Sequence, residues 1–377
     1  MKIGIITQSL QGNYGGILQN YALQTVLKRM GHNPVTIDQL GIWIPNFWND
    51  LAINIKVFLY NLIFGKRKLF VKQYLEIKDR AISDVQNFVH RNINATPKCW
   101  GLRQFAKIAQ KQKFDAYIVG SDQVWRPCYA PNIGVSYLEF TKDIDAIRIA
   151  YAASFGVDNW EYTPAQTKKC RVLARRFDGI SVREESGVDL CRKHLNIDAI
   201  QVLDPTMLLE KEDYCRLLKD VDDSGIQKIF TYILDSDQGK KDCIKSISNR
   251  IGLECFSINQ EEPFSFSIPE DETKRYYPPI EDWLKAFRDS SYVVCDSFHG
   301  TVFSIIFNKP FVVLKNDARG NARFTSLLKM FGLESRLANS DEAVDILLKP
   351  IDWEEVNAKR QLLITKSIDF LNKYLNE

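Results

Sequence analysis

The sequence predicts an α/β protein with two doubly wound domains, on three observations. At 377 residues the chain is too long for one ordinary core, so two domains are expected. Short apolar runs typical of buried parallel strands alternate with amphipathic, helix-type segments. This alternation breaks at Asp204-Pro205 and then starts again. We therefore expect two Rossmann-like domains with a cleft between them.

The predicted domain boundaries follow from this break. Residues 1–205 form the N-terminal domain and residues 206–350 the C-terminal domain. Within the first domain, residues 41–101 have an irregular composition, and we interpret them as an insertion over the top of the sheet, suited to a lid or an acceptor platform. A helix within residues 351–377 is long enough to cross back onto the first domain.

The composition excludes several classes of protein. Hydrophobic residues make up 45% and charged residues 26%, as in globular proteins, and the net charge of +3 gives no reason to expect nucleic acid as a partner. The eight cysteines are scattered without a CxxC pair, and the four histidines do not cluster with them. We expect no metal site, no disulfide framework, no cofactor and a cytoplasmic location. The chain begins directly with a predicted strand, so no signal peptide is expected.

Apolar and amphipathic runs predict the elements of the first half. The predicted strands are Lys2–Gln8, Pro34–Asp38, Phe114–Val119, Ile147–Ser154, Gly179–Val182 and Ala199–Leu203. The predicted helices are Ile17–Met30, Leu51–Phe64, Phe70–Phe88 and Gly187–Leu195. Gln11–Gly16 is a loop whose glycines let the backbone approach a ligand. Its GxxGG spacing is not the GxGxxG of dinucleotide-binding proteins, which disfavours nicotinamide or flavin binding.

The second half repeats the pattern. The predicted strands are Lys228–Leu234, Leu253–Ile258, Tyr292–Cys295 and Phe311–Leu314. The predicted helices are Lys240–Ile251, Ile280–Arg288, Thr301–Phe307, Asn321–Phe331 and Asp352–Asn376.

The most apolar helix, Leu51–Phe64, is followed by Lys66-Arg67-Lys68. It is too short to span a bilayer and contains Lys56. We interpret it as a buried or lid helix. The alternative is an interfacial helix whose basic flank contacts anionic lipid at the cytoplasmic face of the inner membrane.

Polar clusters follow four of the predicted strands: Asn13-Tyr14-Gly15, Ser121-Asp122-Gln123, Arg183-Glu184 and Asp296-Ser297-Phe298-His299-Gly300. In open α/β sheets, ligands bind outside the carboxyl ends of the strands, so the clusters can meet in the interdomain cleft. The last cluster precedes a helix, whose N-terminus offers unpaired N–H groups to an anion. A histidine there can titrate near neutrality and donate a proton. The alternative is a capped helix in which His299 is an ordinary surface or core residue.

Four charged residues suit such a cleft. Arg183 can grip a carboxylate or phosphate with two hydrogen bonds, or it can pair with Glu184 or Glu185. Asp122 can accept a proton from a hydroxyl, or it can cap the next helix. Two more arginines, Arg319 and Arg323, can add positive charge to the same cleft or lie on the surface.

An ordered set of motifs carries a family resemblance: NYGG at 13–16, VGSDQVW at 119–125, YAASFG at 151–156, SVRE at 181–184, LDP at 203–205 and SFHGTVFS at 297–304. Over Lys2 to about Phe331 the chain resembles the polysaccharide pyruvyl transferase family. The resemblance implies a fold similar to the two-domain B-type glycosyltransferases, with the acceptor on the N-terminal domain and the donor on the C-terminal domain. It also implies transfer of pyruvate from phosphoenolpyruvate to a sugar as a cyclic ketal, with release of phosphate.

The resemblance further implies that His299 is the general acid and that Arg183 holds the donor's phosphate or carboxylate. Some members have an arginine two positions before that histidine. Here the position is Ser297, and Arg319 or Arg323 can substitute.

The chemistry needs an acid, a base and an anion cradle, and no metal. We assign the base to Asp122 and the cradle to Arg183 with the N–H groups at Gly300. We expect the other substrate-binding residues to be Ser297, Asn13, Tyr14, Gly15 and Ser121. The aromatic residues Tyr14, Trp125 and Phe298 can stack on sugars or pack in the core.

The expected partners are phosphoenolpyruvate and a lipid-linked or nucleotide-linked precursor of a surface polysaccharide. Two other functions stay open at this point. One is a B-type glycosyltransferase that uses a nucleotide sugar. The other is a non-catalytic protein that binds a glycan or an anion.

Overall fold

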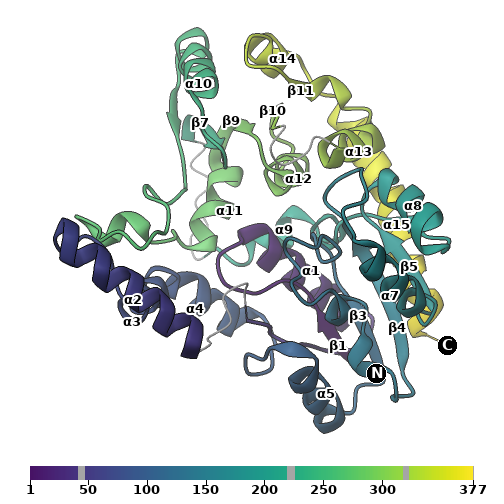
Figure 1. The fold of residues 1–377 in the computed structure, drawn as a ribbon. Coiled ribbons are helices and arrows are strands. Elements are labelled where there is room, and N and C mark those ends of the chain that lie inside the picture. Colours follow the sequence, from purple (N-terminus) through teal and green to yellow (C-terminus); the bar gives the residue numbers. More distant parts are fainter. Residues whose placement is uncertain (41–46, 219–225, 317–321, 377) are drawn as a thin grey trace.

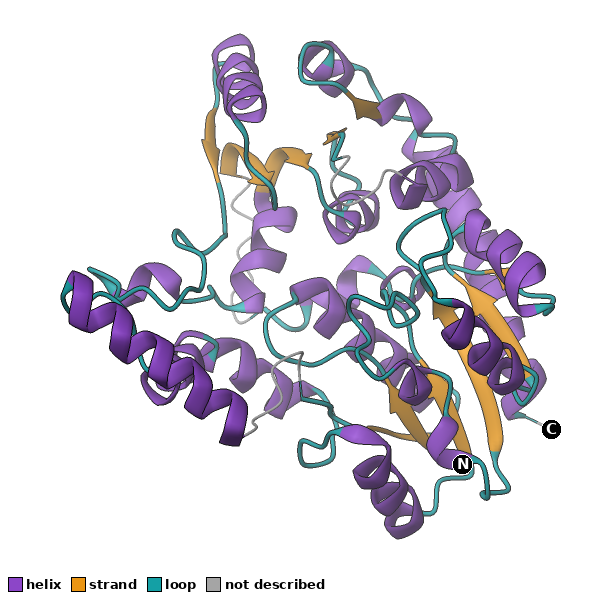
Figure 2. Cartoon of the chain, in the orientation of Figure 1, coloured by secondary structure: helices purple, strands orange, loops and turns teal. Residues whose placement is uncertain are grey.

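The computed structural model describes residues 1–40, 47–218, 226–316 and 322–376. Two parallel β-sheets form the centres of two α/β halves, and helices cover their faces (Figures 1 and 2). The fold class predicted from the sequence is therefore confirmed. The predicted boundary at residue 205 falls between the two sheets.

The first sheet has the strand order β2-β1-β3-β4-β5-β6 within the described chain, and all its neighbouring strands are parallel. Its strands are β1 (Lys2–Ile6), β2 (Asn33–Thr36), β3 (Ala116–Val119), β4 (Ile147–Ala153), β5 (Gly179–Val182) and β6 (Ile200–Gln201). The strand order reverses between β1 and β3, which are neighbours in the sheet. Loops after β1 and β3 therefore emerge side by side at this switch point.

The second sheet has the order β11-β10-β9-β7-β8 in the described ranges, again with parallel neighbours. Its strands are β7 (Ile226–Tyr232), β8 (Glu254–Phe256), β9 (Ser290–Cys295), β10 (Phe311–Leu314) and β11 (Leu337–Ala338). All four residues of β10 are buried, as an apolar run covered by helices on both faces requires. The switch point lies between β7 and β9.

The helices up to the start of the second sheet are α1 (Tyr14–Arg29), α2 (Phe47–Phe64), α3 (Val71–Ala81), α4 (Ser83–Asn92), α5 (Gly101–Gln112), α6 (Ile133–Ser136), α7 (Pro164–Ala174), α8 (Glu185–Leu190) and α9 (Lys211–Cys215). The later helices are α10 (Gln238–Ile251), α11 (Ile280–Asp289), α12 (Phe298–Ile306), α13 (Ala322–Phe331), α14 (Ala343–Leu348) and α15 (Trp353–Leu375). No helix in the described ranges combines the length and apolarity that crossing a bilayer requires.

The insertion differs in detail from the prediction. The single helix expected over Phe70–Phe88 is two helices, α3 and α4, which meet at Ile82, where φ is −98° and ψ is 8°. Together with α2 they project from the first domain (Figure 1). Trp43, which contributed to the prediction of this insertion, lies outside the described residues.

The long C-terminal helix α15 packs on the first domain. The backbone N–H of Leu203 donates to Ser367 Oγ (3.0 Å), and the Arg360 guanidinium donates to the carbonyl oxygens of Met207 and Leu209. The ring of Tyr374 lies directly over Gly179, where any side chain would collide with it. The helix therefore fixes the end of β6 and the segment that follows it.

Candidate functional site

A cleft of about 850 Å³ lies where the two switch points face each other. Its first wall comes from the loops after β1 and β3, and its second wall from the loops after β7 and β9. The described residues that line it include Asn13, Tyr14, Gly15, Asp122, Tyr129, Tyr232, Ser236, Glu261, Tyr277, Ser297, Phe298, His299 and Arg323. The polar clusters after β1, β3 and β9 are therefore brought together.

Helix α12 presents its N-terminus to the cleft. Ser297 is the N-cap, and its Oγ accepts from the N–H of Gly300 (3.3 Å). The helix begins at Phe298, three residues before the predicted start, so His299 lies in its first turn. Gly300 uses its N–H in this cap, which removes it from the predicted anion cradle. The N–H groups of Phe298 and His299 remain at the end of the helix, where no helical carbonyl can accept from them.

Helix α1 presents its N-terminus to the same cleft, from the other domain. It begins at Tyr14 because Asn13 caps it, with Oδ1 accepting from the N–H of Gly16 (3.1 Å). Gly15 and Gly16, expected in a loop, thus form the first helical turn. A Cβ on Gly15 would collide with Nδ1 of His299, so the imidazole of one domain rests against the bare backbone of the other.

Asp204 is the buried centre of the site. Its Oδ2 accepts from Ser121 Oγ (2.7 Å) and from the Arg183 guanidinium (2.9 Å), and it lies 3.7 Å from His299 Nε2. Its Oδ1 accepts from the N–H and hydroxyl of Thr206 (3.0 and 2.6 Å). The carboxylate thus joins both domains.

Burial favours the protonated form of Asp204, but the His299 imidazole and the Arg183 guanidinium outweigh it. They hold the pKa of Asp204 well below its usual range. The carboxylate is therefore ionised at neutral pH, and a protonated His299 has a buried anion beside it.

Arg183 and His299 both lie next to Asp204, but Arg183 is buried behind the residues that line the cleft. The residue is 2% exposed, and its guanidinium pairs with Asp204 (2.9 Å), Glu184 (3.0 Å) and Asp122 (3.8 Å). The Phe298 ring covers it, with the guanidinium carbon 3.9 Å from the ring centroid. The predicted alternative, an ion pair between Arg183 and Glu184, is therefore found in the structure. Arg183 is not among the described residues that line the cleft, and its carboxylate partners already occupy it.

The arginine that lines the cleft is Arg323, whereas the sequence predicted Arg183 in that position. It lines the cleft and is largely buried, next to Arg183, Glu184 and Asp122. Burial, followed by the charge of Arg183, lowers its pKa to about 10. The side chain is therefore charged at neutral pH and poorly solvated, which favours a bound anion. Arg319 lies outside the described residues.

Asp122 lines the cleft in a left-handed backbone conformation (φ 67°). Its Oδ2 accepts from Asn13 Nδ2 (2.9 Å), which joins the loops after β1 and β3. Its Oδ1 accepts from the N–H of Gln123 (2.9 Å). In the described chain no α-helix starts after Asp122 until α6, so the predicted alternative of a helix cap is wrong.

Other predicted residues divide between the cleft and the core. Tyr14 lines the cleft and donates its hydroxyl to the carbonyl of Pro278 (2.6 Å). Ser121 is fully buried beneath the site. Trp125 is also fully buried and stacks on Tyr137, with ring centroids 4.8 Å apart. Of the predicted roles of Trp125, core packing is correct and sugar stacking is wrong.

Two parts of the site were missed from the sequence. Asp204 is predicted from the sequence as part of a chain break and of the LDP motif but not as a site residue, although it follows a strand as the other clusters do. The loop Asn259–Glu261 and Tyr277 also line the cleft. The N–H of Tyr277 donates to the carbonyl of Ala81 in the insertion, a contact that no local pattern reveals.

Comparison with known proteins places the chain in a family. The sequence model described as Polysaccharide pyruvyl transferase matches residues 13–318, most of the chain and all the motifs of the site. The chain belongs to the polysaccharide pyruvyl transferase family. No match was found among curated proteins.

The fold of this pyruvyl transferase family member is similar to that of several solved structures. A putative UDP-N-acetylglucosamine 2-epimerase from Listeria monocytogenes matches with a TM-score of 0.55 and 10% identity, over 100% of this chain and 97% of that one. The S. aureus MnaA–UDP co-structure matches with a TM-score of 0.54 and 12% identity, over 100% and 97%. The spinosyn rhamnosyltransferase SpnG gives a TM-score of 0.43 and 10% identity, over 99% and 97%. At these identities the two matches with TM-scores above 0.5 concern the fold alone.

Substitution of Gly15 tests the contact between the domains. In the Gly15→Ala protein, the added Cβ must displace the His299 ring, so the imidazole signal of His299 should shift in NMR spectra while those of the other three histidines stay in place. Gly239→Ala, in the first turn of α10, is the matched control. An unchanged His299 signal in Gly15→Ala would contradict this packing.

Substitution of Asp204 tests the buried charge cluster. Asp204→Asn keeps the shape of the side chain but removes the anion that faces Arg183. We expect the free energy of unfolding, measured in urea, to fall by about 3–5 kcal/mol. Asp189→Asn is the control, because its side chain is 76% exposed. If the two variants are equally stable, Asp204 does not hold the cluster together.

Proposed function

We propose that the protein transfers pyruvate from phosphoenolpyruvate to a sugar of a surface-polysaccharide precursor as a cyclic ketal, and releases phosphate. Family membership supports a pyruvyl transferase. The observation that carries the proposal is the position of His299, in a cleft between two helix N-termini and beside the buried carboxylate of Asp204. This arrangement suits proton donation to an anionic substrate.

The donor is assigned to the space between α1 and α12. Phosphoenolpyruvate carries a phosphate and a carboxylate, and both helix N-termini favour anions. Arg323 adds a full positive charge in a poorly solvated position. Arg183 acts behind this surface as a positioning residue, because it binds Asp204 and supports the Phe298 ring.

The reaction begins with protonation of the donor's methylene carbon. Nε2 of His299 faces Asp204, and the other ring nitrogen, Nδ1, lies beside Gly15. We therefore assign the transferred proton to Nδ1. The methylene becomes a methyl group, and positive charge develops on the adjacent carbon. A sugar hydroxyl attacks this carbon and gives its proton to Asp122.

Ring closure releases the phosphate. The bond between the former enol carbon and the phosphate oxygen breaks, and a second hydroxyl of the same sugar forms the second ketal bond. The proton held by Asp122 leaves with phosphate, and the proton of the second hydroxyl replaces the one spent by His299. The balance is one donor and one sugar diol giving one ketal and one phosphate, without an oxidant or reductant.

The acceptor is assigned to the outer part of the cleft. Tyr129 and Tyr277 line it, and Tyr129 is exposed, so its ring can stack on a sugar. The precursor that carries this sugar is lipid-linked or nucleotide-linked.

Removal of the acid gives the most direct test of turnover. With phosphoenolpyruvate and candidate acceptor glycans, His299→Ala should release phosphate at least about a hundredfold more slowly than wild type. His90→Ala, at an exposed histidine on α4, should match wild type.

Two results would contradict the proposal. Consumption of a nucleotide sugar instead of phosphoenolpyruvate would indicate a B-type glycosyltransferase. Full biological activity in His299→Ala would indicate a non-catalytic binding protein.

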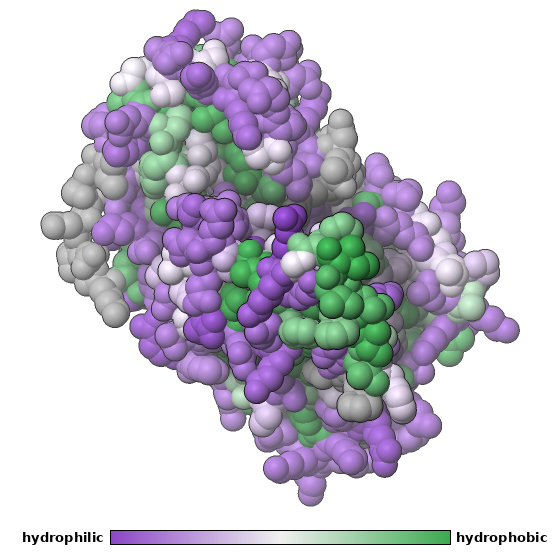
Figure 3. Space-filling model, turned by 60° about the vertical axis from the view of Figure 1, so that its left-hand side comes forward, coloured by the Kyte–Doolittle hydropathy of each residue, from purple (hydrophilic) through white to green (hydrophobic). Residues whose placement is uncertain are grey.

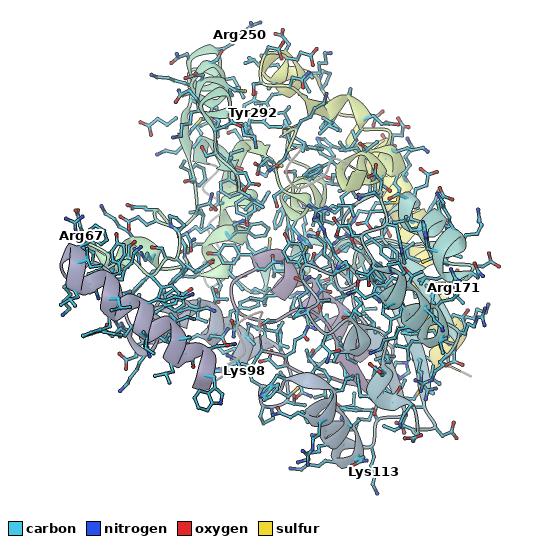
Figure 4. All side chains as sticks on the ribbon, in the orientation of Figure 1. Arg67, Lys98, Lys113, Arg171, Arg250 and Tyr292 are labelled. Atoms are coloured by element: carbon cyan, nitrogen blue, oxygen red, sulfur yellow. The ribbon has the colours of Figure 1, made fainter. Side chains whose placement is uncertain are left out.

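Removal of the buried cation tests the donor site. Arg323→Met should raise the KM for phosphoenolpyruvate roughly tenfold to a hundredfold, since hydrogen bonds to charged groups contribute about 1.5–3 kcal/mol. Arg250→Met is the control, at the outer tip of the second domain (Figure 4). An unchanged KM in Arg323→Met would place the donor elsewhere.

A further inference from the structure

Helix α2 carries its apolar side chains on the outside of the molecule. Trp48, Leu62 and Ile63 are 73%, 72% and 71% exposed. The other exposed apolar residues of the helix are Leu51, Ala52, Ile55, Phe58, Leu59, Tyr60 and Phe64. They form the hydrophobic area that faces the viewer in Figure 3. We call this surface, from Trp48 to Phe64, the outer face of α2.

Polar residues fix this orientation from the inside. Asn54 Oδ1 accepts from the N–H of Val71 (2.9 Å). Two turns later, Asn61 Oδ1 accepts from the N–H groups of Arg67 and Lys68 (3.0 and 2.9 Å) and its Nδ2 donates to the carbonyl of Lys68 (2.9 Å). The asparagines thus bind the turn before α3, and the helix cannot rotate to bury its outer face without breaking these bonds.

The arrangement is the reverse of an ordinary surface helix. Such a helix turns an apolar stripe to the core and polar residues to water. A contiguous exposed apolar surface usually marks a binding site for a partner. At about 1.5 Å per residue, the 18 residues of α2 make a surface about 27 Å long.

The charges around the outer face identify the partner. Lys56, Lys66 and Arg67 are exposed, and in the described chain no carboxylate lies within ion-pair distance of them. Arg67 lies at the outer tip of the insertion (Figure 4). An apolar helix face with a tryptophan and a basic flank matches a helix that lies in the interface of an anionic bilayer. We propose that α2 docks the protein on an anionic lipid surface.

The insertion also connects α2 to the cleft. Leu69 N–H donates to the carbonyl of Phe266 (2.7 Å), and Ile268 N–H donates to that of Arg67 (3.1 Å). Farther along the same loop, Tyr277 N–H donates to the carbonyl of Ala81 (2.9 Å), and Tyr277 lines the cleft. Docking therefore holds the cleft at a set position relative to the bilayer. With the cleft held near the bilayer, the acceptor sugar would be lipid-linked. This statement about the acceptor rests on the proposed function, whereas the docking of α2 does not.

Vesicle sedimentation tests the docking. Wild-type protein should sediment with phosphatidylcholine vesicles that contain phosphatidylglycerol and much less with phosphatidylcholine alone. The double variant Leu62→Glu/Ile63→Glu should bind at least about tenfold more weakly, because each buried aliphatic side chain contributes about 1.5–3 kcal/mol. Lys66→Glu/Arg67→Glu should remove the preference for anionic vesicles. The control is Leu362→Glu on α15, since Leu362 is 74% exposed and should not affect binding.

Three results would overturn the docking proposal. One is that wild-type protein sediments with neither kind of vesicle. Another is that the Leu62→Glu/Ile63→Glu protein binds vesicles as strongly as wild type. A third is wild-type protein that is oligomeric by light scattering, ignores vesicles, and becomes monomeric in that variant, which would make the outer face a contact between copies of the chain. Phosphate release with a short, lipid-free acceptor should be the same in wild type and variant, so failed docking can be told from failed catalysis.

Discussion

The buried carboxylate of Asp204 lies between a guanidinium of its own domain and an imidazole of the other. A carboxylate without solvent is costly unless cations and hydrogen-bond donors surround it. Ser121 and Arg183 of the first domain meet this requirement together with Thr206 at the domain boundary, and His299 is the contribution of the second domain. The same interaction therefore stabilises the domain contact and orients the histidine.

The position of this interaction follows from the topology of the two sheets. In each sheet the strand order reverses between two neighbours, and the loops that leave them diverge and expose the helix N-termini. Asn13 caps one helix and Ser297 the other, so the two ends meet with His299 and Gly15 in contact. A glycine is required there because the imidazole occupies the place of its side chain. The N-termini of α1 and α12, the His299 imidazole and the Asp204 carboxylate thus lie at one point between the two domains.

Much of this could be predicted from the sequence, because parallel sheets place the residues that follow their strands at one edge. The fold class, the two sheets and the convergence of Asn13, Asp122 and His299 all follow from that rule. The rule does not predict the direction in which each side chain points. Arg183 looked like an anion ligand, but Glu184 and Asp204 hold it in the interior.

Two other features lay beyond local patterns. The starts of α1 and α12 were placed three residues late, since glycine and a polar run usually indicate a loop. The segment Leu51–Phe64 was correctly expected to be helical, but its orientation depends on Asn54 and Asn61 binding the next turn. The apolar composition alone favoured burial of that helix.

A crystal structure of the protein with phosphoenolpyruvate bound tests the central claim most directly. We predict that the donor lies between the N-termini of α1 and α12, with its anionic groups near Arg323 and its methylene carbon within reach of the His299 imidazole. Asp204 should stay paired with Arg183 in that complex. A donor bound outside this cleft, or a His299 ring turned away from both the donor and Asp204, would contradict it.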